Sequence, residues 1–123
     1  MILLVIVALI LWVVWSNTAL RVNNYTVLET SLPESFCGYR IAHISDFHNA
    51  QIGKDNEKLL RTLEASKLNM IAITGDFIDS YHTNLEIALK FIRKAVKIAP
   101  CYYVPGNHES RLDIYRELKS EME

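Results

Sequence analysis

Apolar and polar residues alternate along the chain in runs that each predict one element of secondary structure. Three short apolar runs are typical of buried strands, at residues 40–45, 70–74 and 101–104. Between them, apolar side chains recur at helical spacing over residues 54–68 and 84–98, with charged side chains on the opposite faces. Strands that alternate with amphipathic helices require crossover connections, so the pattern predicts a largely parallel sheet.

Further signals extend this order at both ends. Residues 25–30 alternate in polarity and predict an edge strand, and a third helix is predicted from Ser110 to the end of the chain. The helix over 84–98 opens on a capping box that runs from Thr83 to Glu86, and Pro100 prevents its continuation. The predicted fold class is therefore α/β, with the element order β-β-α-β-α-β-α.

The first twenty residues form a separate apolar segment without a charged side chain. Twenty helical residues span about 30 Å, enough to cross a bilayer, and Trp12 and Trp15 fit an interfacial anchor. We predict a single transmembrane helix at 1–20, a linker with the edge strand at 21–38, and a domain at 39–123. A cleaved signal peptide and a buried core helix are the alternatives. The charges that flank the segment bias its orientation weakly, and we expect a cell-membrane protein whose domain lies outside the cytoplasm.

Length, net charge and cysteine spacing limit the classes of function open to this chain. At 123 residues there is room for one modest domain. The formal net charge of −1 offers no basic patch, so we expect no nucleic-acid partner. Cys37 and Cys101 lack metal-site spacing; we expect two small, half-buried residues, and a single disulfide is the alternative.

Polar side chains follow each of the three central strands. Asp46 and His48 come after the first, Asp76 follows Gly75 after the second, and Asn107 and His108 come after the third. The carboxyl ends of parallel strands share one edge of a sheet, where ligands bind in α/β folds. We therefore expect these side chains to meet there.

This set of donors suits metal-assisted hydrolysis of phosphate esters. Two divalent cations neutralise the phosphoryl oxygens and generate hydroxide near neutral pH. We expect Asp46 and His48 to bind one ion, Asp76 to bridge both, and Asn107 to bind the second; His108 would be the catalytic residue that protonates the leaving oxygen. Mixed oxygen and imidazole donors suit manganese, iron or zinc.

The three short segments that follow these strands resemble the D-x-H, G-D and G-N-H-[DE] motifs of the calcineurin-like metallophosphoesterase family. Here they stand as Asp46-Phe47-His48, Gly75-Asp76 and Gly106-Asn107-His108-Glu109, and the surrounding residues resemble the bacterial membrane-associated branch. The resemblance covers residue 39 to the end. It implies a sandwich of two β-sheets flanked by helices, a dinuclear metal site, hydrolase activity on phosphate mono- or diesters, and the same roles for the same five residues.

The chain also departs from the family pattern. The family completes its metal shells with later histidines, whereas the histidines here lie at 43, 48, 82 and 108. We therefore interpret the chain as the amino-terminal part of a longer enzyme; a short variant that dimerises is the alternative. A catalytically inactive membrane-tethered fragment or interaction module, and a protein that binds a single metal ion, are the competing functions.

Three other residues that could be mistaken for metal ligands have structural interpretations. We expect His43 to be a packed, hydrogen-bonded strand residue and His82 to lie in a surface loop. We expect Glu109 to help start the last helix or to orient His108, without binding metal.

Overall fold

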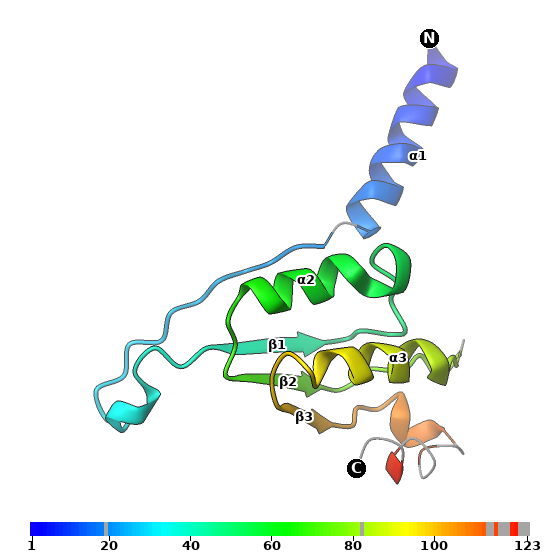
Figure 1. Cartoon of the computed structure of the whole chain (residues 1–123). Helices are drawn as coiled ribbons and strands as arrows, with labels where there is room; N and C mark the ends of the chain where they lie inside the picture. The colour runs from blue at the N-terminus through cyan, green and yellow to red at the C-terminus, as the bar shows by residue number, and fades with distance from the viewer. Residues whose placement is uncertain (19, 82, 113–114, 116–118, 121–123) are drawn as a thin grey trace.

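The computed structural model describes the chain except for residues 19, 82, 113–114, 116–118 and 121–123. Strands and helices alternate along it after a separate first helix (Figure 1). Their bounds are α1 Ile2–Thr18, β1 Ile41–Ser45, α2 Glu57–Ala65, β2 Met70–Thr74, α3 Leu85–Ala95 and β3 Cys101–Val104. Short 3-10 turns lie at Glu34–Phe36, Lys54–Asn56 and Glu109–Arg111.

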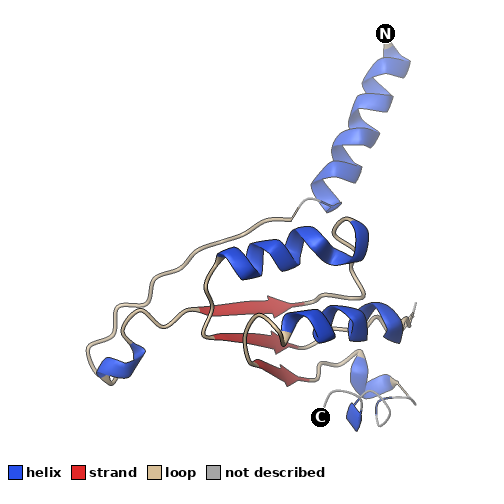
Figure 2. Ribbon diagram, viewed as in Figure 1, coloured by secondary structure: helices blue, strands red, loops and turns tan. Residues whose placement is uncertain are grey.

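The three strands form one parallel sheet in the order β1-β2-β3, and all of them point the same way (Figure 2). Ile71 and Ile73 of the central strand are fully buried on one face. On the opposite face Tyr102 and Val104 remain 61% and 58% exposed. The sheet is therefore covered on one face and open on the other within the described residues.

Helices α2 and α3 pack together over the covered face. Their apolar stripes join Ile71 and Ile73 in one core, to which they contribute Leu59, Leu60, Leu63, Ala88, Phe91, Ile92 and Ala95. Phe47 and Phe77, which follow β1 and β2, reach the same core. The ring of Phe47 lies 4.8 Å from that of Phe77 and 5.0 Å from that of Phe91. These aromatic residues fix the two loops that carry the candidate ligands.

The described structure confirms the α/β class and the parallel sheet, and it corrects the ends of several elements. The helix predicted over 54–68 begins as a 3-10 turn and ends at Ala65, because Lys67 adopts the left-handed conformation (φ 49°). The prediction of an edge strand at 25–30 was wrong. These residues have no strand partner in the described part of the chain, and Leu28 is 92% exposed. The helix predicted from Ser110 starts with a 3-10 turn and falls mostly outside the described residues, as does His82. The second sheet of the expected sandwich is not among the described elements.

The first helix is shorter than the sequence suggested. Helix α1 has 17 residues and rises about 25 Å, less than the roughly 30 Å of a bilayer's hydrocarbon core. No helix in the described part of the chain is long and apolar enough to cross a membrane. The transmembrane helix predicted at 1–20 is therefore not found.

Candidate metal centre

The loops that leave the three strands continue side by side beyond the sheet. The backbone N–H of His48 donates to the carbonyl of Asp76 at 2.9 Å, and that of Asn49 donates to the carbonyl of Phe77 at 3.1 Å. On the other side, the N–H of Gly75 donates to the carbonyl of Val104 at 2.8 Å. Backbone hydrogen bonds therefore hold the three candidate segments next to one another at the carboxyl edge.

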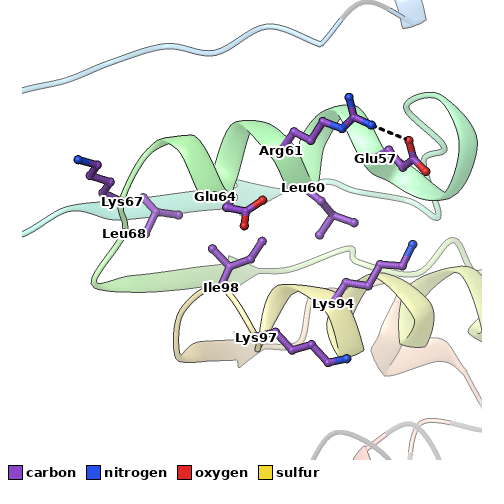
Figure 3. Close-up of a pocket in the computed structure, with 9 residues that line it drawn as sticks. All are labelled: Glu57, Leu60, Arg61, Glu64, Lys67, Leu68, Lys94, Lys97 and Ile98. Carbon is purple, nitrogen blue, oxygen red and sulfur yellow. Dashed lines mark hydrogen bonds and ion pairs between the residues drawn. The ribbon is translucent and has the colours of Figure 1, made fainter.

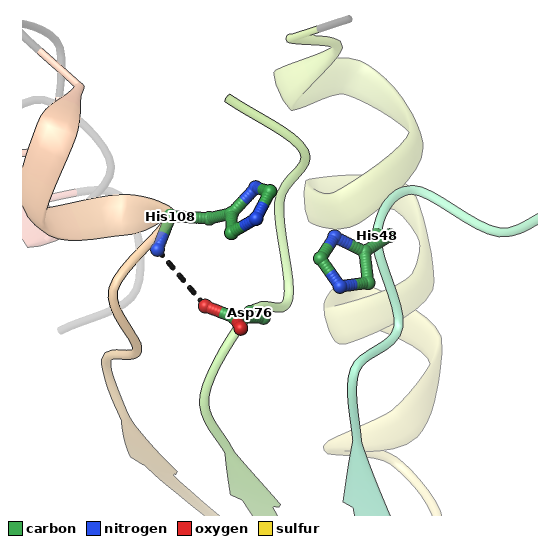
Figure 4. A group of neighbouring side chains, drawn as sticks. All are labelled: His48, Asp76 and His108. Atoms are coloured by element: carbon green, nitrogen blue, oxygen red, sulfur yellow. Dashed lines mark hydrogen bonds between the residues drawn. The ribbon is translucent and has the colours of Figure 1, made fainter. Parts of the chain in front are cut away.

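Three side chains converge at this edge, one from each loop (Figure 4). One ligand atom from each of His48, Asp76 and His108 lies within 4.8 Å of the other two, and all three side chains are partly buried. The rings of His48 and His108 meet edge to face, with centroids 4.6 Å apart. Two imidazoles and a carboxylate at this spacing can hold one divalent ion.

Asn107 lies directly against Asp76. In the amide orientation that satisfies both groups, the NH2 of Asn107 donates to the Asp76 carboxylate, at 3.2 Å to Oδ1 and 3.0 Å to Oδ2. An amide turned by 180° from this orientation would present its oxygen beside the carboxylate, where a bound cation could use it as a ligand. The amide thus fits a metal-bound state through its oxygen and a metal-free state through its nitrogen.

Asp46 lies outside the group of three. Its backbone N–H donates to the carbonyl of Gly75 at 3.3 Å, and the residue is exposed. Asp46, His48 and Asp76 all have positive φ, at 51°, 46° and 49°. Left-handed backbone is unfavourable for residues other than glycine, although least so for Asp and Asn, and such residues cluster at functional sites.

His108 is oriented by the loop after β2. Its Nδ1 accepts the backbone N–H of Ser80 at 3.2 Å and lies 3.1 Å from the Ser80 hydroxyl and 3.7 Å from the Asp79 carboxylate. Because Nδ1 accepts a hydrogen bond, the neutral ring carries its proton on Nε2. No pattern in the sequence indicates these contacts with Asp79 and Ser80, which the tertiary structure creates.

Glu109 is fully buried beneath these loops. Its Oε2 accepts the N–H groups of Asp76 at 3.1 Å and Gly106 at 2.9 Å, and its Oε1 accepts that of Ile78 at 2.8 Å. The pKa of Tyr103 is well above its ordinary value because the phenol is buried and, secondarily, because the Glu109 charge is near. The sequence places Glu109 beside His108 but does not reveal that its carboxylate spans two loops.

Two glycines allow the loops to approach this closely. A Cβ on Gly106 would collide with the backbone nitrogen and Oδ1 of Asp76 and would lie 2.8 Å from the Cα of Gly75. Gly75 itself has φ +72°. The loops therefore need glycine at position 106 because a side chain would not fit there, and at position 75 because the backbone is left-handed.

Features away from this edge have structural explanations. His43 contacts the Thr74 hydroxyl through Nε2 at 2.5 Å, as expected of a hydrogen-bonded strand residue. Cys37 and Cys101 are free; Cys37 is exposed, and burial raises the pKa of the half-buried Cys101. A groove between α2 and α3 carries both charges, including Glu64 and Lys94, but contains none of the candidate ligands (Figure 3).

Comparison with known families identifies the class of this domain. The family model described as calcineurin-like phosphoesterase matches residues 39–122. This match covers more than half of the sequence, so the chain belongs to the calcineurin-like phosphoesterase family. No curated protein and no solved structure matches the chain.

The family depends on two bound metal ions, and the donor atoms at this edge are of the kinds that bind such ions. The group of His48, Asp76 and His108 offers nitrogen and oxygen donors to one ion. The Asn107 amide lies against the Asp76 carboxylate, and its oxygen is a donor of the kind that a second ion would need.

Proposed function

We propose that this chain hydrolyses phosphate mono- or diesters with the help of bound divalent ions. The convergence of His48, Asp76 and His108 at the carboxyl edge of a parallel sheet carries this proposal. Membership of the calcineurin-like phosphoesterase family supports the reaction class.

Each residue has a proposed role in this reaction. Bound divalent ions would neutralise the phosphoryl oxygens and supply a water-derived nucleophile. His48 and Asp76 would hold the first ion with Asp46, and Asp76 and Asn107 the second. His108 would donate from Nε2 to the leaving oxygen, because Nδ1 already accepts from Ser80.

Hydrolysis of p-nitrophenyl phosphate and of its bis-ester tests the proposal. The full chain, kept in a mild detergent, should release p-nitrophenol when Mn²⁺ is added. Asp76→Asn should lower turnover by at least about 100-fold, while Glu64→Gln, an exposed residue of α2 that is not among the candidate ligands, should not change it. Absence of turnover with manganese, iron and zinc would contradict the proposal.

The role of His108 can be separated from metal binding. His108→Ala should lower kcat by about 10²–10⁴-fold if the ring acts as an acid. The affinity for Mn²⁺, measured by titration calorimetry, should then remain within a few-fold of wild type. A parallel loss of affinity would make His108 a metal ligand, a role that its place in the group of three allows.

A second candidate function is metal binding without hydrolysis. The position of Asp46 outside the group of three favours it, because the carboxylate and imidazole donors that do converge, from His48, Asp76 and His108, surround a single point. Metal analysis after dialysis distinguishes the two functions. Two ions per chain support the phosphoesterase, and one ion per chain supports the binding protein.

We also propose that α1 associates with lipid. The side chains of Ile2–Trp15 are all apolar and the large ones are exposed, with Trp12 at 62% and Trp15 at 66%. An apolar surface of this extent is typical of a site of association. The full chain should float with phosphatidylcholine vesicles in a density gradient, and a chain lacking residues 1–18 should not. Equal flotation of both would contradict the proposal.

A further inference from the structure

A buried carboxylate is costly unless hydrogen bonds replace its lost hydration, and Glu109 is 0% exposed. Three backbone N–H groups supply this compensation, at 2.8 to 3.1 Å. Bonds between a carboxylate and backbone N–H groups are charge-assisted and stronger than neutral ones. Glu109 therefore differs from the exposed acidic residues of the helices, because it is buried and its carboxylate is hydrogen-bonded only within the protein.

The three donors belong to two different loops. Asp76 and Ile78 lie in the loop after β2, and Gly106 lies in the loop after β3. Oε2 of Glu109 receives one bond from each loop and so joins them at the point where Gly106 contacts Asp76. The relative position of the two loops therefore depends on this carboxylate.

Asp76 is held from both ends. Its backbone N–H donates to Glu109, and its side-chain Oδ1 accepts the backbone N–H of His108 at 2.9 Å. The positive φ of Asp76 is unfavourable and persists only where surrounding contacts impose it. The bond to Glu109 is one such contact, and it acts on the backbone that directs the carboxylate toward His48.

We propose that Glu109 is a positioning residue that holds the backbone of Asp76, and with it the loop after β3, in the geometry that binds metal. This inference rests on the proposed metal binding by Asp76. Glu109 is not itself a ligand in this proposal, because its oxygens are buried and already accept backbone N–H groups. Partners that orient a metal ligand typically contribute about 10–100-fold to metal affinity.

Titration calorimetry with Mn²⁺ on the full chain in mild detergent tests the proposal. Glu109→Gln should weaken Mn²⁺ binding by about 10–100-fold, because its NH2 group would face N–H donors where an oxygen now accepts them. Glu109→Asp keeps the charge but is one methylene shorter, and it should give an intermediate loss. Glu64→Gln on α2 is the matched control and should bind as wild type.

Two results would overturn the proposal. The first is a Glu109→Gln protein that is folded by circular dichroism and binds Mn²⁺ within twofold of wild type. The second is a loss of unfolding free energy in both Glu109 variants with unchanged Mn²⁺ affinity, which would make Glu109 a purely structural residue.

Hydrogen exchange on the wild-type chain keeps the proposal testable if Glu109→Gln fails to fold. The amides of Asp76, Ile78 and Gly106 should exchange slowly without metal, although none of them lies in a strand or helix. Exchange at the rate of an unstructured peptide would overturn the proposal. Neither experiment requires hydrolysis, so an inactive wild type whose Mn²⁺ binding depends on Glu109 would contradict only the proposed function.

Discussion

Gly106 is the residue at which the loops after β2 and β3 come closest. Gly106→Ala would drive a methyl group into the backbone nitrogen of Asp76, which cannot move without breaking its bond to Glu109. We expect the free energy of unfolding to fall by about 1–3 kcal/mol, as for other overpacked positions. Urea denaturation measures this loss, and the affinity for Mn²⁺ should fall with it.

Gly38 provides the matched control for that prediction. It has φ +73°, and a methyl group added there would meet nothing within 4 Å, so Gly38→Ala carries the cost of a left-handed residue without a collision. It should lower the unfolding free energy and leave Mn²⁺ affinity unchanged. Equal Mn²⁺ affinity in the Gly106→Ala protein would show that this close approach is unimportant for the site.

At the scale of single elements, the start of α3 shows how a local signal can be assigned to the wrong residue. The sequence predicted a capping box from Thr83, but the structure places Asn84 at the N-cap, where its side chain accepts the N–H of Ile87 at 3.3 Å. Asn84→Ala should cost about 1 kcal/mol of unfolding free energy, and Thr83→Ala much less. Thermal denaturation of the two variants distinguishes them, and the reverse order would favour the capping box.

The turn before α2 is tied to α3 by an ion pair whose effect depends on pH. Lys90 Nζ lies 2.7 Å from Asp55 Oδ1 and holds the pKa of Asp55 below its ordinary value of 3.8. The stabilising contribution of Asp55 is therefore complete above pH 3.8 and is lost as the pH falls through the lowered pKa. Wild type should be more stable than Asp55→Asn near neutral pH, and the difference should shrink below pH 3.8.

A Lys90→Met background supplies the control, because Asp55→Asn should then have little effect at any pH. Asparagine tolerates the positive φ of 54° at this position, so the substitution tests the charge and leaves the backbone in place. Urea denaturation across the acidic range measures both comparisons. A pH-independent difference would contradict the role of the pair.

Strands and helices with strong local periodicity were predictable, and the contacts among loops were not. The bounds of β2 and β3 agree with the apolar runs, because their side chains face a core that the sequence pattern already defines. The left-handed Lys67 that ends α2 and the missing strand at 25–30 depend on tertiary contacts, which periodicity does not encode. The three bonds of Glu109 join residues up to 33 positions apart, and only the folded chain brings them together.

At the scale of the whole molecule, the candidate metal centre joins loops from all three strands, so metal binding and folding should be coupled. Metal bound to the native state alone, at a free concentration about 100 times its Kd, stabilises a protein by about 2.7 kcal/mol. For a domain of this size, this gain raises Tm by on the order of 10 °C. Scanning fluorimetry with Mn²⁺ should show the rise, and a chelator should reverse it. Asp76→Asn should show little response; an equal rise in that variant would mean that the ion binds elsewhere in the chain.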